Sequence, residues 1–209
     1  MTFDMWLAFA AASTALLVIP GPTLMMVLSY ALSDGRRVAM ASALGVATGD
    51  LIAMTLSVIG LGALLLTSAL AFTVLKWVGA AYLVYLGVRM ILSAGGATST
   101  LTGRAPGQRP GRVFRDLTTV TALNPKSNTF FIAFVPQFID PSAAYAPQAA
   151  ILIATFVGIA AINAMVFALA ATAMRSRITR PAVQAWLTRA GGATLVAMGA
   201  LTATLRRAA

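Results

Sequence analysis

The chain has 209 residues, of which 59% are hydrophobic and 10% are charged, and its mean hydropathy is +0.87. This composition excludes an ordinary soluble domain and predicts an all-α integral membrane protein. The net charge is +10, and the chain lacks Cys, His and Glu. Disulfides and the usual zinc, haem and nucleophilic-triad sites are therefore excluded, and we expect no metal and no cofactor.

Six segments are long and apolar enough to cross a membrane as helices of about 20 residues. We predict spans at 5–33, 38–66, 70–92, 113–138, 147–174 and 185–205. The first apolar run is too long for a cleaved signal peptide, and no basic residue precedes it, so we interpret it as an uncleaved span. Residues 93–112 are polar and rich in Gly, Thr, Pro and Arg, which indicates a linker.

The basic residues indicate the orientation of these spans. Two lie between spans one and two, five between spans three and four, and four between spans five and six. The other side has three, which are Lys76, Arg206 and Arg207. The positive-inside rule therefore predicts a cytoplasmic linker and both termini outside the cytoplasm. We expect the membrane to be a bacterial-type inner membrane. Because orientation explains the positive charge, we expect a lipid bilayer as surroundings and no nucleic-acid partner.

The linker divides the chain into two similar halves, 1–92 and 113–209, with three predicted spans each. Since three is odd, the second half must cross the membrane in the opposite sense to the first. Short matches accompany this division: Gly45 precedes Asp50 by five residues, as Gly158 precedes Asn163. We therefore predict two inverted three-helix repeats, with broken first and fourth spans.

The breaks occur inside apolar runs. They consist of Pro20, Gly21 and Pro22 in the first span, and of Asn124, Pro125 and Lys126 in the fourth. Proline removes an amide donor and frees backbone carbonyls, which a membrane tolerates only where they line a cavity or are buried in protein. Paired breaks in two halves are the sequence feature that best indicates the binding site of a secondary transporter. We expect all six residues to bind substrate.

Depth in the membrane groups these breaks with two other polar residues. Pro22, Asp50, Lys126 and Asn163 each lie 11 to 13 residues from the nearest cytoplasmic charge. At about 1.5 Å per residue, all four are roughly 16 to 20 Å deep, near the middle of the bilayer. Asn163 is therefore added to the predicted substrate-binding residues.

Asp50 and Lys126 are the ionisable residues near the centre of a span, and each would cost about 2.5 to 3.5 kcal/mol if it faced lipid. They should face the protein interior. One interpretation is that they form a salt bridge or satisfy freed carbonyls; the other is that they bind substrate or relay a proton. Asp50 can hold an ammonium group or take a proton, and we assign it the coupling proton. Lys126, or the amide ends of the broken helices, can bind a carboxylate.

Gly45 and Gly49 form a GxxxG spacing, which predicts close helix packing. Such packing would turn the adjacent Asp50 toward a neighbouring helix.

The motifs together resemble the LysE/RhtB family of amino-acid and metabolite exporters. The resemblance covers nearly the whole chain and rests on the Pro-Gly-Pro break, on GVATGD at 45–50, on KWVGAAYLVYLG at 76–87 and on LNPKSNTFFIAFVPQF at 123–138. It implies a six-span, proton-driven exporter of small amino acids or derivatives, of the homoserine, threonine or lysine kind. It also implies that Pro22, Asp50, Asn124, Pro125 and Lys126 lie at or near the transport pathway.

We therefore expect an exporter that works by alternating access. The alternatives are a membrane enzyme and an exporter of a metabolite other than an amino acid; a channel would need a continuous polar lining, which these spans lack. For an enzyme, Ser127 follows Lys126 but should point about 100° away from it on a helix. The substrate, the coupling ion and the oligomeric state, including a homo-oligomer, stay open.

Overall fold

The computed structural model describes residues 1–19, 21–67, 69–93, 107–140, 142–178 and 180–204. Regular secondary structure in these residues is entirely helical. The elements are α1 (Phe3–Val18), α2 (Pro22–Thr67), α3 (Ala69–Ser93), α4 (Pro110–Ala122), α5 (Pro125–Phe134), the 3₁₀ helix η1 (Val135–Phe138), α6 (Tyr145–Ile178) and α7 (Pro181–Thr204). The all-α prediction is confirmed for this part of the chain.

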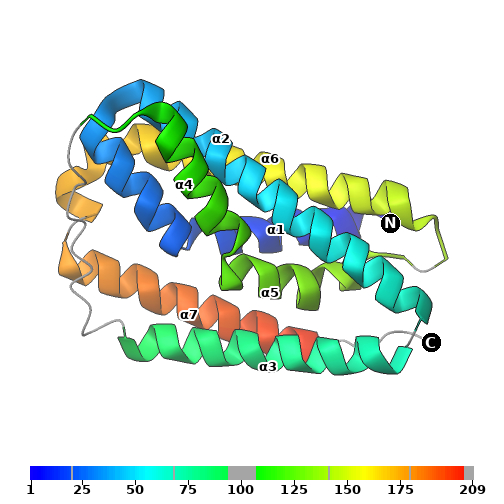
Figure 1. Cartoon of the computed structure of the whole chain (residues 1–209). Helices are drawn as coiled ribbons and strands as arrows, with labels where there is room; N and C mark the ends of the chain where they lie inside the picture. Colours follow the sequence, from blue (N-terminus) through cyan, green and yellow to red (C-terminus); the bar gives the residue numbers. More distant parts are fainter. Residues whose placement is uncertain (20, 68, 94–106, 141, 179, 205–209) are drawn as a thin grey trace.

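Helix α2 bends back on itself in Figure 1, although it forms one continuous helical element from Pro22 to Thr67. The sequence predicts two spans here, separated by a short connection at 34–37. In the structure the backbone stays helical through that connection. The reversal keeps the beginning and the later part of α2 in the same bundle.

Length and hydropathy identify membrane-crossing segments among the described residues. Two helical segments meet the requirements, Arg37–Gly60 of α2 and Tyr145–Ala170 of α6. A third results if α1 and Thr23–Ala31 of α2 form one bent span. The chain is therefore a membrane protein with at least two segments able to cross a bilayer.

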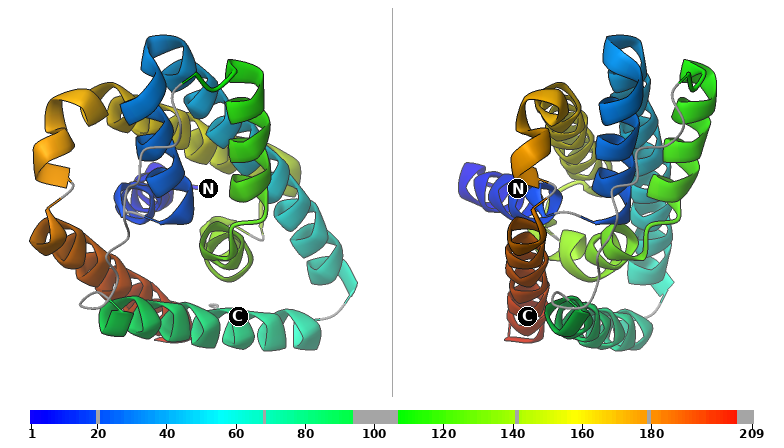
Figure 2. Two further views of the ribbon diagram at one scale, coloured as in Figure 1. Left: turned by 60° about the vertical axis from the view of Figure 1, so that its left-hand side comes forward. Right: turned by 90° about the vertical axis from the view of Figure 1, so that its left-hand side faces the viewer.

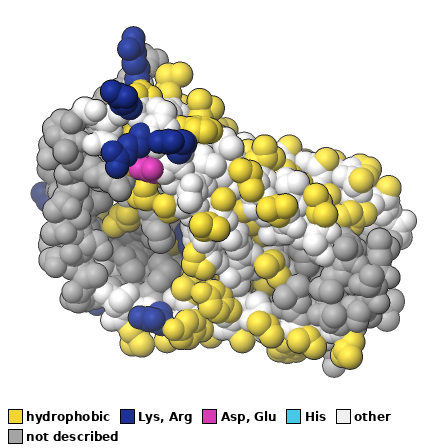
Figure 3. Space-filling view, in the orientation of Figure 1, with side chains coloured by type: hydrophobic (Ala, Val, Ile, Leu, Met, Phe, Trp, Pro, Cys, Tyr) yellow, Lys and Arg dark blue, Asp and Glu magenta, His cyan; other side chains and the backbone are white. Residues whose placement is uncertain are grey.

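The two ends of the bundle differ in charge. Arg37, Arg109, Arg112 and Arg115 are exposed where α2 bends and α4 begins. Figure 3 shows Lys and Arg side chains gathered over this part of the surface, which we call the basic end. Arg180, also exposed, lies at the junction of α6 and α7, on the same side of Figure 1.

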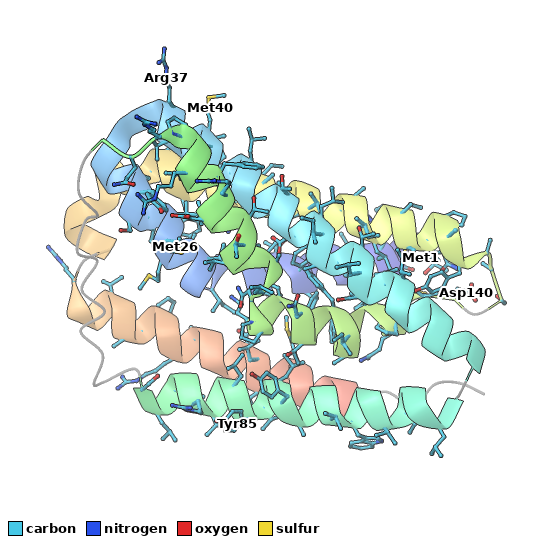
Figure 4. All side chains as sticks on the ribbon, in the orientation of Figure 1. Met1, Met26, Arg37, Met40, Tyr85 and Asp140 are labelled. Atoms are coloured by element: carbon cyan, nitrogen blue, oxygen red, sulfur yellow. The ribbon has the colours of Figure 1, made fainter. Side chains whose placement is uncertain are left out.

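The opposite end holds Met1 and Asp140, which lie together in Figure 4, far from Arg37. The Met1 amino group is 3.9 Å from the Oδ2 atom of Asp140. Side-chain and backbone hydrogen bonds from Ser142 hold the pKa of the Asp140 carboxyl below its usual range. The chain therefore presents separate polar surfaces at the two ends, with apolar helices between them.

Each of the two breaks separates a pair of helices. Helices α1 and α2 meet at the first break, and α1 makes an angle of 58° with the Thr23–Ala31 stretch. Helices α4 and α5 meet at the second, between Ala122 and Pro125. Both following helices begin with proline, whose missing N–H has no partner in the first turn of a helix anyway.

Helices α3 and α7 pack side by side in Figure 1 and in both views of Figure 2. Glycines allow this approach. A Cβ atom on Gly87 would lie 2.5 Å from the Gly192 carbonyl oxygen, and one on Gly199 would lie 2.7 Å from the Ala80 carbonyl oxygen. Helix α4 similarly packs against α2 at Gly45 and Gly49. The buried Asp50 follows directly after these two glycines.

Candidate functional site

A cavity lies where the two breaks meet. Its volume is about 40 Å³, enough for ordered water molecules. Residues of α1, both parts of α2, α4, α5, α6 and the two breaks contribute to its wall. The lining residues are Leu17, Ile19, Gly21, Thr23, Leu24, Val27, Val46, Asp50, Thr121, Asn124, Lys126, Ser127, Ala160, Asn163 and Ala164.

The end of α1 is bound by two polar side chains from the second half of the chain. Lys126 is 7% exposed, and its Nζ atom donates a hydrogen bond of 2.9 Å to the Ile19 carbonyl oxygen. Asn163 donates from Nδ2 to the Leu17 carbonyl oxygen at 3.0 Å. The last carbonyls of a helix have no partner within it, and the negative end of the helix dipole attracts a cation. These contacts therefore satisfy carbonyls that the first break exposes.

Asn124 connects the second break to the first. Its Oδ1 atom accepts a 3.0 Å hydrogen bond from the Lys126 amide and so caps α5. Its Nδ2 atom donates to Thr23 Oγ1 at 3.1 Å, near the start of α2. Thr121 Oγ1 lies 3.4 Å from the same Thr23 hydroxyl. The starts of α2 and α5 are thereby held at one side of the cavity.

Asp50 has no comparable set of partners. Its side chain is 1% exposed, and its Oδ1 atom forms no hydrogen bond with the described residues. Within the described part of the chain, no ion pair within 4.0 Å joins Asp50 to Lys126. A buried carboxylate oxygen without a partner is costly, because it loses hydration without gaining a hydrogen bond. A proton, water or a cationic ligand can supply the missing interaction.

The structure brings most of the predicted site residues together. Gly21, Asp50, Asn124, Lys126 and Asn163 all line the cavity. Three predicted members stand apart from this set. Pro125 is exposed and does not line the cavity, because the first residue of α5 faces away from it. Pro20 and the side chain of Pro22 lie outside the described residues.

The sequence interpretation misses three hydroxyl side chains in the wall, those of Thr23, Thr121 and Ser127. Ser127 was expected to point away from Lys126, yet both residues line the cavity. Helical spacing misleads here because the long Lys126 side chain reaches back toward Ile19 from the first turn of α5. Ser127 and Lys126 form no hydrogen bond with each other in the described structure, and the Lys126 amine already binds Ile19.

Comparisons with known proteins agree over most of the chain. A family model described as LysE type translocator matches residues 14–205. The "Homoserine/homoserine lactone efflux protein" of Salmonella typhimurium is 36% identical over 208 residues, which cover 100% of both chains. An "Uncharacterized membrane protein" of Vibrio cholerae is 33% identical over 99% of this chain and 100% of its own. The "Leucine efflux protein" of Salmonella choleraesuis is 32% identical over 67% of this chain and 66% of its own. No solved structure matches the chain.

Proposed function

The chain belongs to the LysE type translocator family, and from this and from the cavity we propose that it exports small amino acids or their derivatives across the bacterial inner membrane. The resemblance that its motifs carry is thus confirmed. Two of the relatives are named as efflux proteins, for homoserine or its lactone and for leucine. These names support a transporter rather than an enzyme, and they support amino acids as the substrate class.

The observation that carries this proposal is the position of Asp50. Its carboxylate is buried in a cavity between two broken helices, and its Oδ1 atom has no partner among the described residues. A purely structural carboxylate would be expected to have its hydrogen bonds filled. An unfilled one beside a cavity suits a group that binds a transported cation or proton in turn.

Alternating access by two inverted repeats is supported by the packing of α3 on α7. A Cβ on Gly87 would meet Gly192 O and the amide and Cγ2 atoms of Val196. One on Gly199 would meet Ala80 O and the same two atoms of Val84. Adding 112 to the residue numbers 80, 84 and 87 gives 192, 196 and 199. Each of these contacts made by one half of the chain therefore has an equivalent contact made by the other half. Such reciprocal contacts are expected where two related helices cross antiparallel at a pseudo-two-fold axis.

Packed contacts toward both ends of the bundle also support alternating access. Toward the basic end, the buried Tyr30 donates a 2.6 Å hydrogen bond to Asp116 Oδ2, joining α2 to α4. Toward the opposite end, α5 continues from the cavity into packed rings: Phe130 lies 5.1 Å from Phe134 and 5.9 Å from Phe156, between centroids. A carrier that exposes its site to one side at a time needs a barrier that can open on each side.

Asp50 is the proposed site of proton coupling. Moving one charge through 100 mV supplies about 2.3 kcal/mol. Export against a tenfold gradient requires about 1.4 kcal/mol at 25 °C. One proton per substrate is therefore enough for a gradient of this size.

Reconstitution tests the proposal. The purified chain in liposomes should give saturable counterflow of labelled L-homoserine, L-threonine or L-leucine, and an imposed proton gradient should drive their accumulation. The Asp50→Asn variant should still show counterflow, but an imposed proton gradient should no longer drive accumulation of the substrate. Asp4→Asn, which changes an exposed aspartate in the first turn of α1, is the matched control. Full transport driven by the proton gradient in Asp50→Asn would contradict the coupling role. Absence of counterflow for all three amino acids would contradict amino-acid export.

A further inference from the structure

We propose that the cavity orients its substrate as a zwitterion, with the carboxylate at the N-termini of α2 and α5 and the ammonium at Asp50. It follows that amino acids with short, uncharged side chains bind better than cationic amino acids such as lysine. This inference rests on the proposed function, and it adds the orientation of the substrate and a choice among amino acids.

The starts of α2 and α5 both contribute to the cavity wall. The first bonds within these helices run from the Met25 amide to Gly21 O at 2.9 Å and from the Asn128 amide to Asn124 O at 3.0 Å. The amides between these residues therefore have no carbonyl partner within their own helices. Asn124 takes the amide of Lys126, and within the described part of the chain the amides of Thr23, Leu24 and Ser127 have no acceptor. All three of these residues line the cavity.

Two helix N-termini at one cavity favour an anion. Each helix dipole places a partial positive charge at its N-terminus, and free amides add directed hydrogen-bond donors. Lys126 reinforces the positive potential without being free to bind, because its Nζ atom donates to Ile19 O. The geometry thus assigns the substrate carboxylate to backbone amides rather than to the lysine side chain.

Asp50 supplies the second, independent indication of a ligand. It comes from the later part of α2, beyond the bend, and is the acidic residue of the cavity wall. Its Oδ1 atom is buried and has no partner in the described structure. An ammonium group has the charge and the donors that this oxygen lacks. A zwitterion can therefore satisfy both the amides and the carboxylate.

The remainder of the wall determines which side chains fit. Leu24, Val27, Val46, Ala160 and Ala164 contribute apolar surface. A second ammonium, as in lysine, would have to be buried against these residues without a further acidic partner in the wall, which is costly. The present volume of about 40 Å³ also requires the cavity to widen before any amino acid enters. Short side chains require the least widening.

Competition with counterflow of labelled L-homoserine tests the orientation. The competitors are L-threonine, L-threonine amide, which lacks the carboxylate, N-acetyl-L-threonine, which lacks the ammonium, and L-lysine. We expect L-threonine to compete at concentrations at least about tenfold lower than each of the others, which corresponds to about 1.4 kcal/mol. Thermal stabilisation of the purified protein by the same compounds should give the same ranking.

Variants separate the two subsites. In Asp50→Asn, the preference for L-threonine over N-acetyl-L-threonine should disappear, while the preference over the amide should stay; Asp4→Asn should keep both. If Asp50→Asn transports nothing, thermal stabilisation of the folded variant reports the same preferences. Lys126→Met should keep the preference for the free carboxylate, because the amides bind it.

The outcomes are distinct. Lysine competing as well as L-threonine would overturn the inference. So would an unchanged ammonium preference in Asp50→Asn, or loss of the carboxylate preference in a Lys126→Met protein whose thermal unfolding shows that it is folded. In each of these cases amino-acid transport itself would still stand. Failure of wild-type protein both to transport and to be stabilised by any of these amino acids would instead overturn the proposed function and the inference together.

Discussion

The ammonium of Lys126 donates a hydrogen bond to the Ile19 carbonyl oxygen at 2.9 Å and forms no ion pair with Asp50. The two central charges of this chain therefore have different surroundings. Lys126 binds the carboxyl end of α1 and holds the first break against the second. Asp50 keeps an oxygen that has no hydrogen-bond partner among the described residues. The cation therefore has a structural partner, whereas the carboxylate of Asp50 is left to interact with whatever enters the cavity.

Replacing Lys126 with methionine should destabilise the protein. The substitution keeps the unbranched apolar part of the side chain but leaves Ile19 O without its donor, which costs about 1 to 3 kcal/mol for a buried carbonyl. Thermal unfolding of the purified protein in detergent measures the effect. Arg115→Met, at an exposed position of α4, is the control and should change stability little. A Lys126→Met protein as stable as wild type would show that this hydrogen bond does not hold the break.

Gly87→Ala should also lower the unfolding temperature. The new Cβ would lie 2.5 Å from Gly192 O and 2.9 Å from the Val196 amide, and backbone atoms cannot move aside as a flexible side chain can. Overpacking of this kind costs about 1 to 3 kcal/mol. Gly199→Ala should have a similar effect, since it makes the equivalent contacts.

Gly158→Ala is the matched control for these two variants. A Cβ at Gly158 would have no atom of the described residues within 4 Å, and alanine favours a helix. Stability should be unchanged or slightly raised. Equal losses at all three glycines would indicate a general effect of helix substitution, and the close crossing of α3 and α7 would then not explain the result.

Substitutions of Asn124 and Thr23 should have coupled effects on the free energy of unfolding. Asn124→Ala removes the cap of α5, which costs about 0.5 to 2 kcal/mol, and it also removes the 3.1 Å bond to Thr23. A double-mutant cycle with Thr23→Val should give a coupling energy of at least about 0.5 kcal/mol. Asn124→Ser, which can still cap α5, should recover part of the stability. Strict additivity would mean that the two breaks are held together by other contacts.

Tyr30→Phe should open the cavity toward the basic end. Tyr30 comes one turn after the cavity residue Val27, and its hydroxyl binds Asp116, which precedes the cavity residue Thr121 in α4. Loss of this 2.6 Å bond removes a link between α2 and α4 at the basic end of the cavity.

The chain contains no cysteine, so Ser127→Cys would provide a single reporter thiol inside the cavity. Its labelling in vesicles, by a membrane-impermeant maleimide added on the side of the basic end, should become faster when Tyr30→Phe is combined with it. Tyr82→Phe, a change at an exposed tyrosine of α3, should leave the rate unchanged. An unchanged rate in the Tyr30 variant would contradict a barrier at this position.

Several features of this fold follow from the sequence because their causes are local. A proline interrupts a helix but fits its first turn, and Pro22 and Pro125 are the first residues of α2 and α5. The cost of exposing a charge to lipid applies to Asp50 and Lys126 individually, and both side chains are buried. Counting residues from the basic ends of the spans places Asp50 and Asn163 at similar depth, and both line one cavity. The six spans and their orientation remain predictions.

The partners of these residues depend on tertiary structure, because each contact joins segments far apart in the chain. The sequence allows Lys126 to pair with Asp50 or to satisfy a carbonyl, and only packing brings Ile19 within its reach. Packing likewise turns Ser127 into the wall and leaves Pro125 outside it. By itself, the sequence determined where helices break and which residues must avoid lipid. Only the folded bundle decided which carbonyl, amide or empty space each of those residues meets.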